Sequence, residues 1–165
     1  MTPSRLPLFS LALLLLIGPL SAHSEQVSSF PTFQLQTNTG IDWALEDYDG
    51  QPKLVMFWAT WCPYCKRMFP TIKNVHAQYS EQGLKVVAVN FRDKGDTVAY
   101  AHRHGLSFDI VLNGDQLAKE VGVLGTPTVF LLDSNNEVQY RTSNSDPEDP
   151  KLRKAVATLL EGASP

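Results

Sequence analysis

Cysteine is nearly absent from this chain, which has two, Cys62 and Cys65, in 165 residues. A domain stapled by a disulfide framework is therefore excluded, because such frameworks use several pairs. A disulfide between residues so close in sequence restricts the unfolded chain only weakly, so a structural staple is not indicated either. A tetrahedral zinc site would need two more Cys or His ligands. We expect His76, His102 and His104 to be solvated at the surface, and we predict no metal ion.

The chain also lacks a basic excess, internal repeats and low-complexity segments. Its formal net charge is −3, with both signs well mixed, whereas nucleic-acid binders carry a basic patch or stripe. We therefore predict no nucleic-acid partner. Hydrophobic residues make up 43% of the chain and charged residues 19%, ordinary values for a globular domain with a core. The length suits one domain with a short appendage.

A long apolar run occurs only near the N-terminus, and it is too short to cross a membrane comfortably. It is centred on residues 11–17, follows Arg5, and is broken at Gly18–Pro19 before a set of small residues. This is the pattern of a secretory signal peptide. We predict a signal peptide at 1–24 and a domain at 25–165 that is periplasmic or secreted. The alternative is an uncleaved anchor that holds the domain on the periplasmic side of the membrane.

The rest of the chain predicts an α/β domain. After a flexible lead-in at 25–32, alternating apolar and polar residues predict a hairpin over 33–45. Unbroken apolar runs at 54–58 and 86–90 predict buried central strands. The other predicted elements are helices or helical turns over 63–80, 96–104, 115–121 and 151–160, a strand over 109–113, a hairpin of 128–133 with 137–141, and an acidic loop at 143–150. This order indicates a mixed sheet with helices on both faces.

Cys62 and Cys65 lie where a predicted buried strand turns into a helix. Pro63 suits the first helical position, where no amide donor is needed. Cys62 therefore precedes the helix, where unpaired amides and the helix dipole stabilise a thiolate and lower its pKa. Cys65 lies one turn inside, shielded from solvent but close enough to bond Cys62. We predict that Cys62 attacks the substrate and that Cys65 resolves the mixed disulfide.

Two segments, FWATWCPYCKRMFP at 57–70 and GVLGTPTVFLLD at 122–133, closely resemble the thioredoxin superfamily. Within it they resemble the exported TlpA/ResA-like thiol–disulfide oxidoreductases. The resemblance covers residues 30–160. It implies a thioredoxin fold with an added N-terminal hairpin and a central insert around 92–114, and an enzyme that exchanges thiols and disulfides without a cofactor.

The resemblance also implies roles for residues around the thiols. Pro127 matches a proline that follows a cis peptide bond and faces the disulfide. The Thr126 backbone would then be free to pair with an extended segment of substrate. The residues expected to contact substrate are Trp61, Pro63, Tyr64, Thr126 and Pro127, and Trp58 is expected in the core behind the site.

Two acids of the family pattern are missing. Thioredoxins carry a buried Asp where this chain has Met56, and ResA-like proteins commonly carry a Glu where it has Met68. Both acids are candidate proton acceptors for the resolving thiol. We therefore expect Cys65 to lose its proton to water, to a substrate group or to another residue, and its pKa to be raised by apolar surroundings.

Family analogy implies a reductase for exported proteins, for example apocytochromes before haem attachment or copper-site proteins. Its partners would be protein thiols and disulfides and a membrane thiol-transfer electron donor, and we expect a monomer. Three alternatives stay open. Because the chemistry is reversible, the protein could be a disulfide-forming oxidase or isomerase. It could also handle Cu(I) with the same two thiols, or be a catalytically silent docking module.

Overall fold

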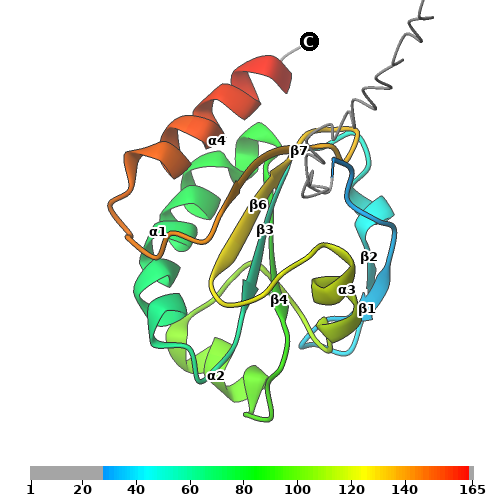
Figure 1. The fold of residues 1–165 in the computed structure, drawn as a ribbon, viewed down its shortest axis with the longest axis vertical. Coiled ribbons are helices and arrows are strands. Elements are labelled where there is room, and N and C mark those ends of the chain that lie inside the picture. Colours follow the sequence, from blue (N-terminus) through cyan, green and yellow to red (C-terminus); the bar gives the residue numbers. More distant parts are fainter. Residues whose placement is uncertain (1–27, 164–165) are drawn as a thin grey trace, which may run out of the picture.

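A five-stranded mixed sheet forms the centre of the molecule (Figure 1). The computed structural model describes residues 28–163, so the predicted signal peptide at 1–24 lies outside the described residues. The sheet has the order β5-β4-β3-β6-β7. Its strands are β3 (Lys53–Trp58), β4 (Lys85–Asn90), β5 (Asp109–Val111), β6 (Thr128–Leu132) and β7 (Val138–Thr142). β3, β4 and β5 run parallel, β6 pairs antiparallel with β3, and β7 pairs antiparallel with β6, which confirms the predicted mixed sheet.

Helices cover both faces of this sheet. They are α1 (Pro63–Tyr79), α2 (Thr97–His104), α3 (Asp115–Glu120) and α4 (Pro150–Ala163), with short 3-10 helices η1 (Leu45–Tyr48) and η2 (Ser80–Gln82). Figure 1 shows α1 and α4 on one side of the sheet and α3 on the other. Within residues 28–163, no helix combines the length and the apolar character needed to cross a membrane.

The central strand β3 packs against both layers. Leu54, Met56 and Trp58 join one core cluster with α1 and α4, whereas Val55 and Phe57 join a second cluster with α3 and the N-terminal segment. All five side chains are fully buried. An unbroken apolar run is what a strand covered on both faces requires, because alternate side chains point to opposite faces.

The predicted N-terminal hairpin is confirmed by β1 (Gln34–Gln36) and β2 (Asp42–Ala44). The flexible lead-in predicted before it is wrong for the described part. Phe30 is only 4% exposed, its ring packs edge-on against Phe130, and its N–H donates to the Asn136 carbonyl at 2.9 Å. Phe30 is not part of a periodic apolar pattern, so the sequence does not predict that it packs against the sheet.

Residues 92–114, predicted as an insert, contain α2 and β5 and complete one edge of the sheet. β5 pairs with β4, with Ile110 opposite Ala88. The other side of β5 meets the hairpin, because the Leu112 N–H donates to the Gln36 carbonyl at 2.7 Å. The segment therefore joins the hairpin to the central sheet.

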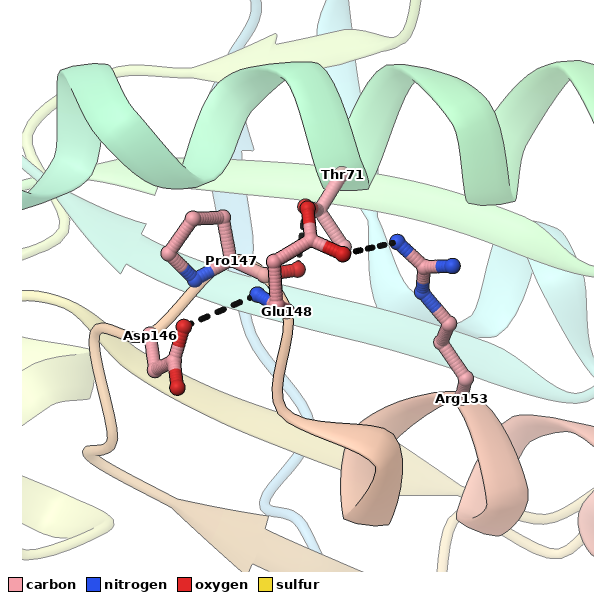
Figure 2. A network of polar contacts seen from close by, with 5 residues as sticks. All are labelled: Thr71, Asp146, Pro147, Glu148 and Arg153. Carbon is pink, nitrogen blue, oxygen red and sulfur yellow. Dashed lines mark hydrogen bonds and ion pairs between the residues drawn. The ribbon is translucent and has the colours of Figure 1, made fainter.

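The predicted acidic loop before α4 is held against α1 (Figure 2). Thr71, 4% exposed, donates from Oγ1 to the Pro147 carbonyl at 2.8 Å. The Asp146 carboxylate accepts from the Glu148 N–H at 3.0 Å. Arg153 and Glu148 form an exposed ion pair at 3.6 Å, and such pairs contribute at most about 1 kcal/mol. The buried Thr71 hydrogen bond therefore fixes the loop more firmly than the ion pair does.

Lys53 begins β3 at the end of the strand away from the cysteines, and it is fully buried. Its Nζ donates to the Gln51 carbonyl at 2.9 Å and to Asn136 Oδ1 at 2.7 Å. Burial lowers the pKa of this ammonium group, although the negative charges of Asp49 and Asp133 oppose the shift. The folded chain therefore releases this proton at a lower pH than the unfolded chain. The free energy of unfolding should rise with pH from the folded pKa up to the unfolded value of about 10.4.

We expect Lys53→Met to abolish this rise. Urea unfolding at several pH values between 7 and 10.5 should show wild type gaining stability relative to the variant as the pH increases. Lys119→Met, at an exposed position on α3, should keep the wild-type pH dependence. Equal pH dependence in wild type and Lys53→Met would contradict the role of Lys53.

Candidate active site

The two cysteines lie at the carboxyl end of β3, where the chain turns into α1. Cys62 is the N-cap of α1 and Pro63 occupies the first turn, as predicted. The Cys65 N–H donates to Cys62 Sγ at 3.0 Å, and the Cys62 N–H donates to the Ala59 carbonyl at 3.1 Å. Cys62 Sγ therefore lies where amide donors and the positive end of the helix dipole favour a thiolate.

The two sulfurs form a disulfide, with Cα atoms 5.3 Å apart. Cys65 is fully buried, as expected, but Cys62 is also only 2% exposed. Exposure therefore does not distinguish the two sulfurs. The hydrogen bond from the Cys65 amide does distinguish them, because it stabilises negative charge on Cys62 Sγ.

The environment behind the disulfide is apolar. Met56 and Met68, at the positions of the two missing acids, are 0% and 1% exposed and share a core cluster with both cysteines. Trp58 is fully buried there, as predicted, and packs edge-on against Phe69 with ring centroids 5.1 Å apart. These surroundings disfavour a charged Cys65 once the pair is reduced.

Strand pairing brings the Thr126–Pro127 motif to the cysteines. The peptide bond between these residues is cis, as predicted. Thr128 lies opposite Phe57 in the pairing of β6 with β3, so the register continues with Pro127 opposite Trp58. Pro127 is buried and Thr126 is half-buried. Among the described residues, the backbone N–H and C=O of Thr126 have no hydrogen-bond partner.

Exposed apolar side chains lie in the cysteine segment and in the loop before Thr126–Pro127. Trp61, Tyr64 and Leu124 are 61%, 51% and 87% exposed. The Arg67 guanidinium lies 4.7 Å from the centre of the Tyr64 ring, and Trp61 Nε1 donates to the Arg92 carbonyl at 2.9 Å. A cleft of about 530 Å³ is lined by Trp61, Arg92, Asp93, Lys94 and Asp115. The sequence predicted Trp61 and Tyr64 but missed Leu124, although an apolar residue in the loop before a Gly-Thr-Pro segment was a usable signal.

The histidines of the described residues agree only in part with the predicted surface positions. Among residues 28–163, His102 is exposed, as predicted, whereas His76 and His104 are half-buried. The prediction was wrong for His76 because Phe108, from a different segment, packs edge-on against its ring. Across residues 28–163, no three His, Cys, Asp or Glu side chains gather closely enough to hold a metal ion.

The sequence also missed an acidic residue beside the cysteine loop. The Asp93 carboxylate accepts hydrogen bonds from the Thr60 N–H and hydroxyl, from the Asn90 side chain and from the Gly95 N–H. Burial raises the pKa of Asp93, whereas these hydrogen bonds lower it. The combined effect of the hydrogen bonds is larger, so the pKa lies below its usual value. Its position shortly after β4 was a usable signal, because the carboxyl ends of parallel strands meet at one edge of the sheet.

Comparisons with known proteins agree with this geometry. Residues 28–141 match the model of the AhpC/TSA family. The thiol-disulfide oxidoreductase ResA of Geobacillus thermodenitrificans is 37% identical over 114 residues, which cover 68% of this chain and 66% of the relative. ResA of Geobacillus kaustophilus is 37% identical over 125 residues, covering 74% of this chain and 72% of the relative. The chain thus spans about two thirds of the length of these relatives.

A solved structure gives the same result for the fold. The crystal structure assigned to a thiol:disulfide interchange protein DsbE from Chlorobium tepidum has a TM-score of 0.74 and 30% sequence identity. The similarity covers 82% of this chain and 98% of that one. The predicted thioredoxin fold is therefore confirmed. The chain belongs to the AhpC/TSA family, as a thioredoxin-like thiol–disulfide oxidoreductase of the ResA/DsbE type with the Cys62–Cys65 pair.

Proposed function

We propose that the protein reduces disulfides of exported proteins, with Cys62 as the attacking thiol and Cys65 as the resolving thiol. The observation that carries this proposal is the hydrogen bond from the Cys65 N–H to Cys62 Sγ at 3.0 Å. It favours ionisation of Cys62, and the thiolate is the reactive form of a cysteine. The apolar core around Cys65 keeps the second thiol protonated until it is needed.

The reaction begins with the reduced pair. The Cys62 thiolate attacks one sulfur of the substrate disulfide, forms a mixed disulfide and releases the other substrate sulfur as a thiolate. Cys65 then loses its proton and attacks Cys62 Sγ, and the second substrate thiolate leaves. The Cys62–Cys65 disulfide is the oxidised product, and two electrons have passed to the substrate.

We assign substrate binding to the exposed rim around the disulfide. Trp61, Pro63 and Tyr64 are exposed on the cysteine side. On the other side, Pro127 shapes the loop. The N–H and C=O of Thr126 have no partner within residues 28–163, so they are suited to strand-like pairing with an extended segment. Such pairing would recognise an unfolded or extended protein chain rather than one particular sequence.

The cellular setting belongs to the same proposal. The signal-like sequence at 1–24 supports export to the periplasm or outside the cell, with an uncleaved membrane anchor as the alternative. A reductase in an oxidising compartment needs a supply of electrons, so we propose a membrane thiol-transfer donor for the Cys62–Cys65 disulfide. Apocytochromes before haem attachment are the substrate example that the ResA resemblance favours, and we expect the protein to act as a monomer.

The reduction potential tests the direction of electron flow. Thioredoxin-fold proteins range from about −270 to −120 mV, and we expect a value near the reducing end, together with reduction of insulin disulfides. Equilibration with glutathione redox buffers would measure the potential, with the double Cys62→Ser, Cys65→Ser variant as the inactive control. A reduction potential of about −120 mV would identify a disulfide-forming oxidase or isomerase instead. Stoichiometric Cu(I) binding without insulin reduction would identify a copper-handling protein.

A further inference from the structure

We propose that Asp93 is a positioning residue for the thiol–disulfide reaction. Its carboxylate holds the loop before Cys62, so that Cys62 Sγ stays at the N-terminus of α1 when the pair is reduced. The inference rests on the redox activity of the cysteine pair but not on the direction in which electrons flow. Asp93 itself contacts neither cysteine and acts through Thr60.

Each oxygen of the Asp93 carboxylate accepts two hydrogen bonds. Oδ1 accepts from Thr60 Oγ1 at 2.7 Å and from the Gly95 N–H at 2.9 Å. Oδ2 accepts from Asn90 Nδ2 at 2.8 Å and from the Thr60 N–H. Thr60, two residues before Cys62, is thus held through both its backbone and its side chain.

Further contacts connect this carboxylate to Cys62. The Cys62 N–H donates to the Ala59 carbonyl at 3.1 Å, which closes the turn around Thr60. Trp61 Nε1 donates to the carbonyl of Arg92, next to Asp93, at 2.9 Å. The loop between β4 and α2 therefore holds consecutive residues of the cysteine loop.

The polar cluster is packed tightly on its other side. Asn90 is 5% exposed, and its Oδ1 accepts from the buried Thr97 hydroxyl at 3.2 Å. A Cβ atom on Gly95 would lie 2.2 Å from Thr60 Oγ1. Only glycine at this position leaves room for the Thr60 hydroxyl to reach Asp93.

The need for this support arises on reduction. In the disulfide, a covalent bond fixes Cys62 to Cys65. Reduction breaks that bond, and the Cys62 sulfur stays near the Cys65 amide only if the loop before it is held in place. Asp93 and Thr60 supply a constraint that does not change when the disulfide opens.

Asp93→Asn tests the proposal because an amide cannot satisfy this site. Each carboxylate oxygen accepts from one backbone N–H, that of Thr60 or that of Gly95, so the amide NH₂ must face one of these donors. We expect the pKa of the Cys62 thiol in the reduced protein to rise toward the free value of about 8.5. At a pH below both pKa values, a rise of one unit would lower the thiolate fraction, and with it the rate of Cys62 alkylation, by about tenfold. The pH profile of alkylation with iodoacetamide, resolved by mass spectrometry, measures this.

Two further variants separate positioning from charge. Asp96→Asn removes the same charge nearby, but Asp96 caps α2 by accepting from the Ala99 N–H at 2.8 Å, a role that Asn fills equally well. It should keep the wild-type pKa of Cys62. Gly95→Ala keeps every charge but forces the Thr60 hydroxyl away from Asp93, so it should raise the pKa of Cys62 as Asp93→Asn does. It also provides the test if Asp93→Asn does not fold.

Two outcomes would overturn the proposal. If Asp93 acts only through its negative charge, Asp93→Asn would lower the pKa of the Cys62 thiol, because removing a nearby anion favours the thiolate. If Asp93 only stabilises the fold, the variants would unfold at lower urea concentration but leave the pKa of Cys62 unchanged. Failure of wild type or of a variant in the insulin assay would leave this readout unaffected, because alkylation needs only the reduced cysteines.

Discussion

A Cys65→Ser variant should stop after one chemical step and accumulate a mixed disulfide on Cys62. The serine cannot attack Cys62 Sγ, so the substrate stays covalently attached. Cys62 keeps its place at the N-cap of α1 and its hydrogen bond from the amide of residue 65, because that donor is backbone. We therefore expect the first attack at close to the wild-type rate and turnover reduced to the rate of the uncatalysed exchange.

The measurement uses a defined peptide disulfide as well as natural partners. Intact-mass analysis should show one peptide bound per chain, and thiol reductants should release it. The matched control is Cys62→Ser, which leaves Cys65 as the only thiol. Cys65 lies in an apolar cluster that disfavours its thiolate, so this variant should capture almost no peptide. If Cys62→Ser captures the peptide as well as Cys65→Ser does, the attacking and resolving roles are reversed. Natural partners trapped by Cys65→Ser would identify the substrate.

Met56→Asp should destabilise the protein by about 3–5 kcal/mol at pH 7, from lost packing and from burial of an unpaired acid. Met56 is fully buried in the apolar cluster that contains both cysteines. Desolvation should raise the pKa of the new carboxyl in the folded protein above its unfolded value of about 3.9. The variant should therefore lose stability relative to wild type as the pH rises above 3.9, until the folded pKa is passed.

Met56→Asn is the matched control for this variant, because the Asn side chain has nearly the same shape as Asp but no ionisable group. Urea unfolding should give similar stabilities for the Asp and Asn variants near pH 3 and a widening gap toward pH 8. A Met56→Asp protein as stable as wild type at pH 7 would contradict this expectation. The buried Trp58 Nε1 has no partner among the described residues. A stable Met56→Asp protein would indicate that this Nε1 donates a hydrogen bond to the new carboxylate.

The chain has methionines at the two positions where the family resemblance implied acids. Met56 and Met68 surround the resolving thiol with apolar atoms, so the proton of Cys65 has no carboxylate acceptor at either position. The comparison of Met56→Asp with wild type therefore also measures what a buried acid would do to the resolving step. Faster release of the mixed disulfide in the variant would show that proton transfer from Cys65 limits the native reaction.

The main chemistry could be predicted from the sequence because it is local. Cys62, Pro63 and Cys65 occupy one strand end and one helical turn, so their relative placement follows from the apolar run before them and the proline after Cys62. The buried strand β3 and the hairpins were predicted for the same reason. The cis bond before Pro127 was implied by a family resemblance rather than by any local pattern.

Other features depended on which segments meet in three dimensions. The pairing of β6 with β3 places Pro127 beside the cysteine loop, and the order β5-β4-β3 places the Asp93 loop beside Thr60. Phe30 and Lys53 are buried by sheet elements far away in the chain. Periodicity reports which side of an element faces the core, whereas strand order and register decide which loops become neighbours. The sequence by itself thus determined the reactive pair and the elements that carry it, and only the tertiary structure decided which distant side chains hold and surround that pair.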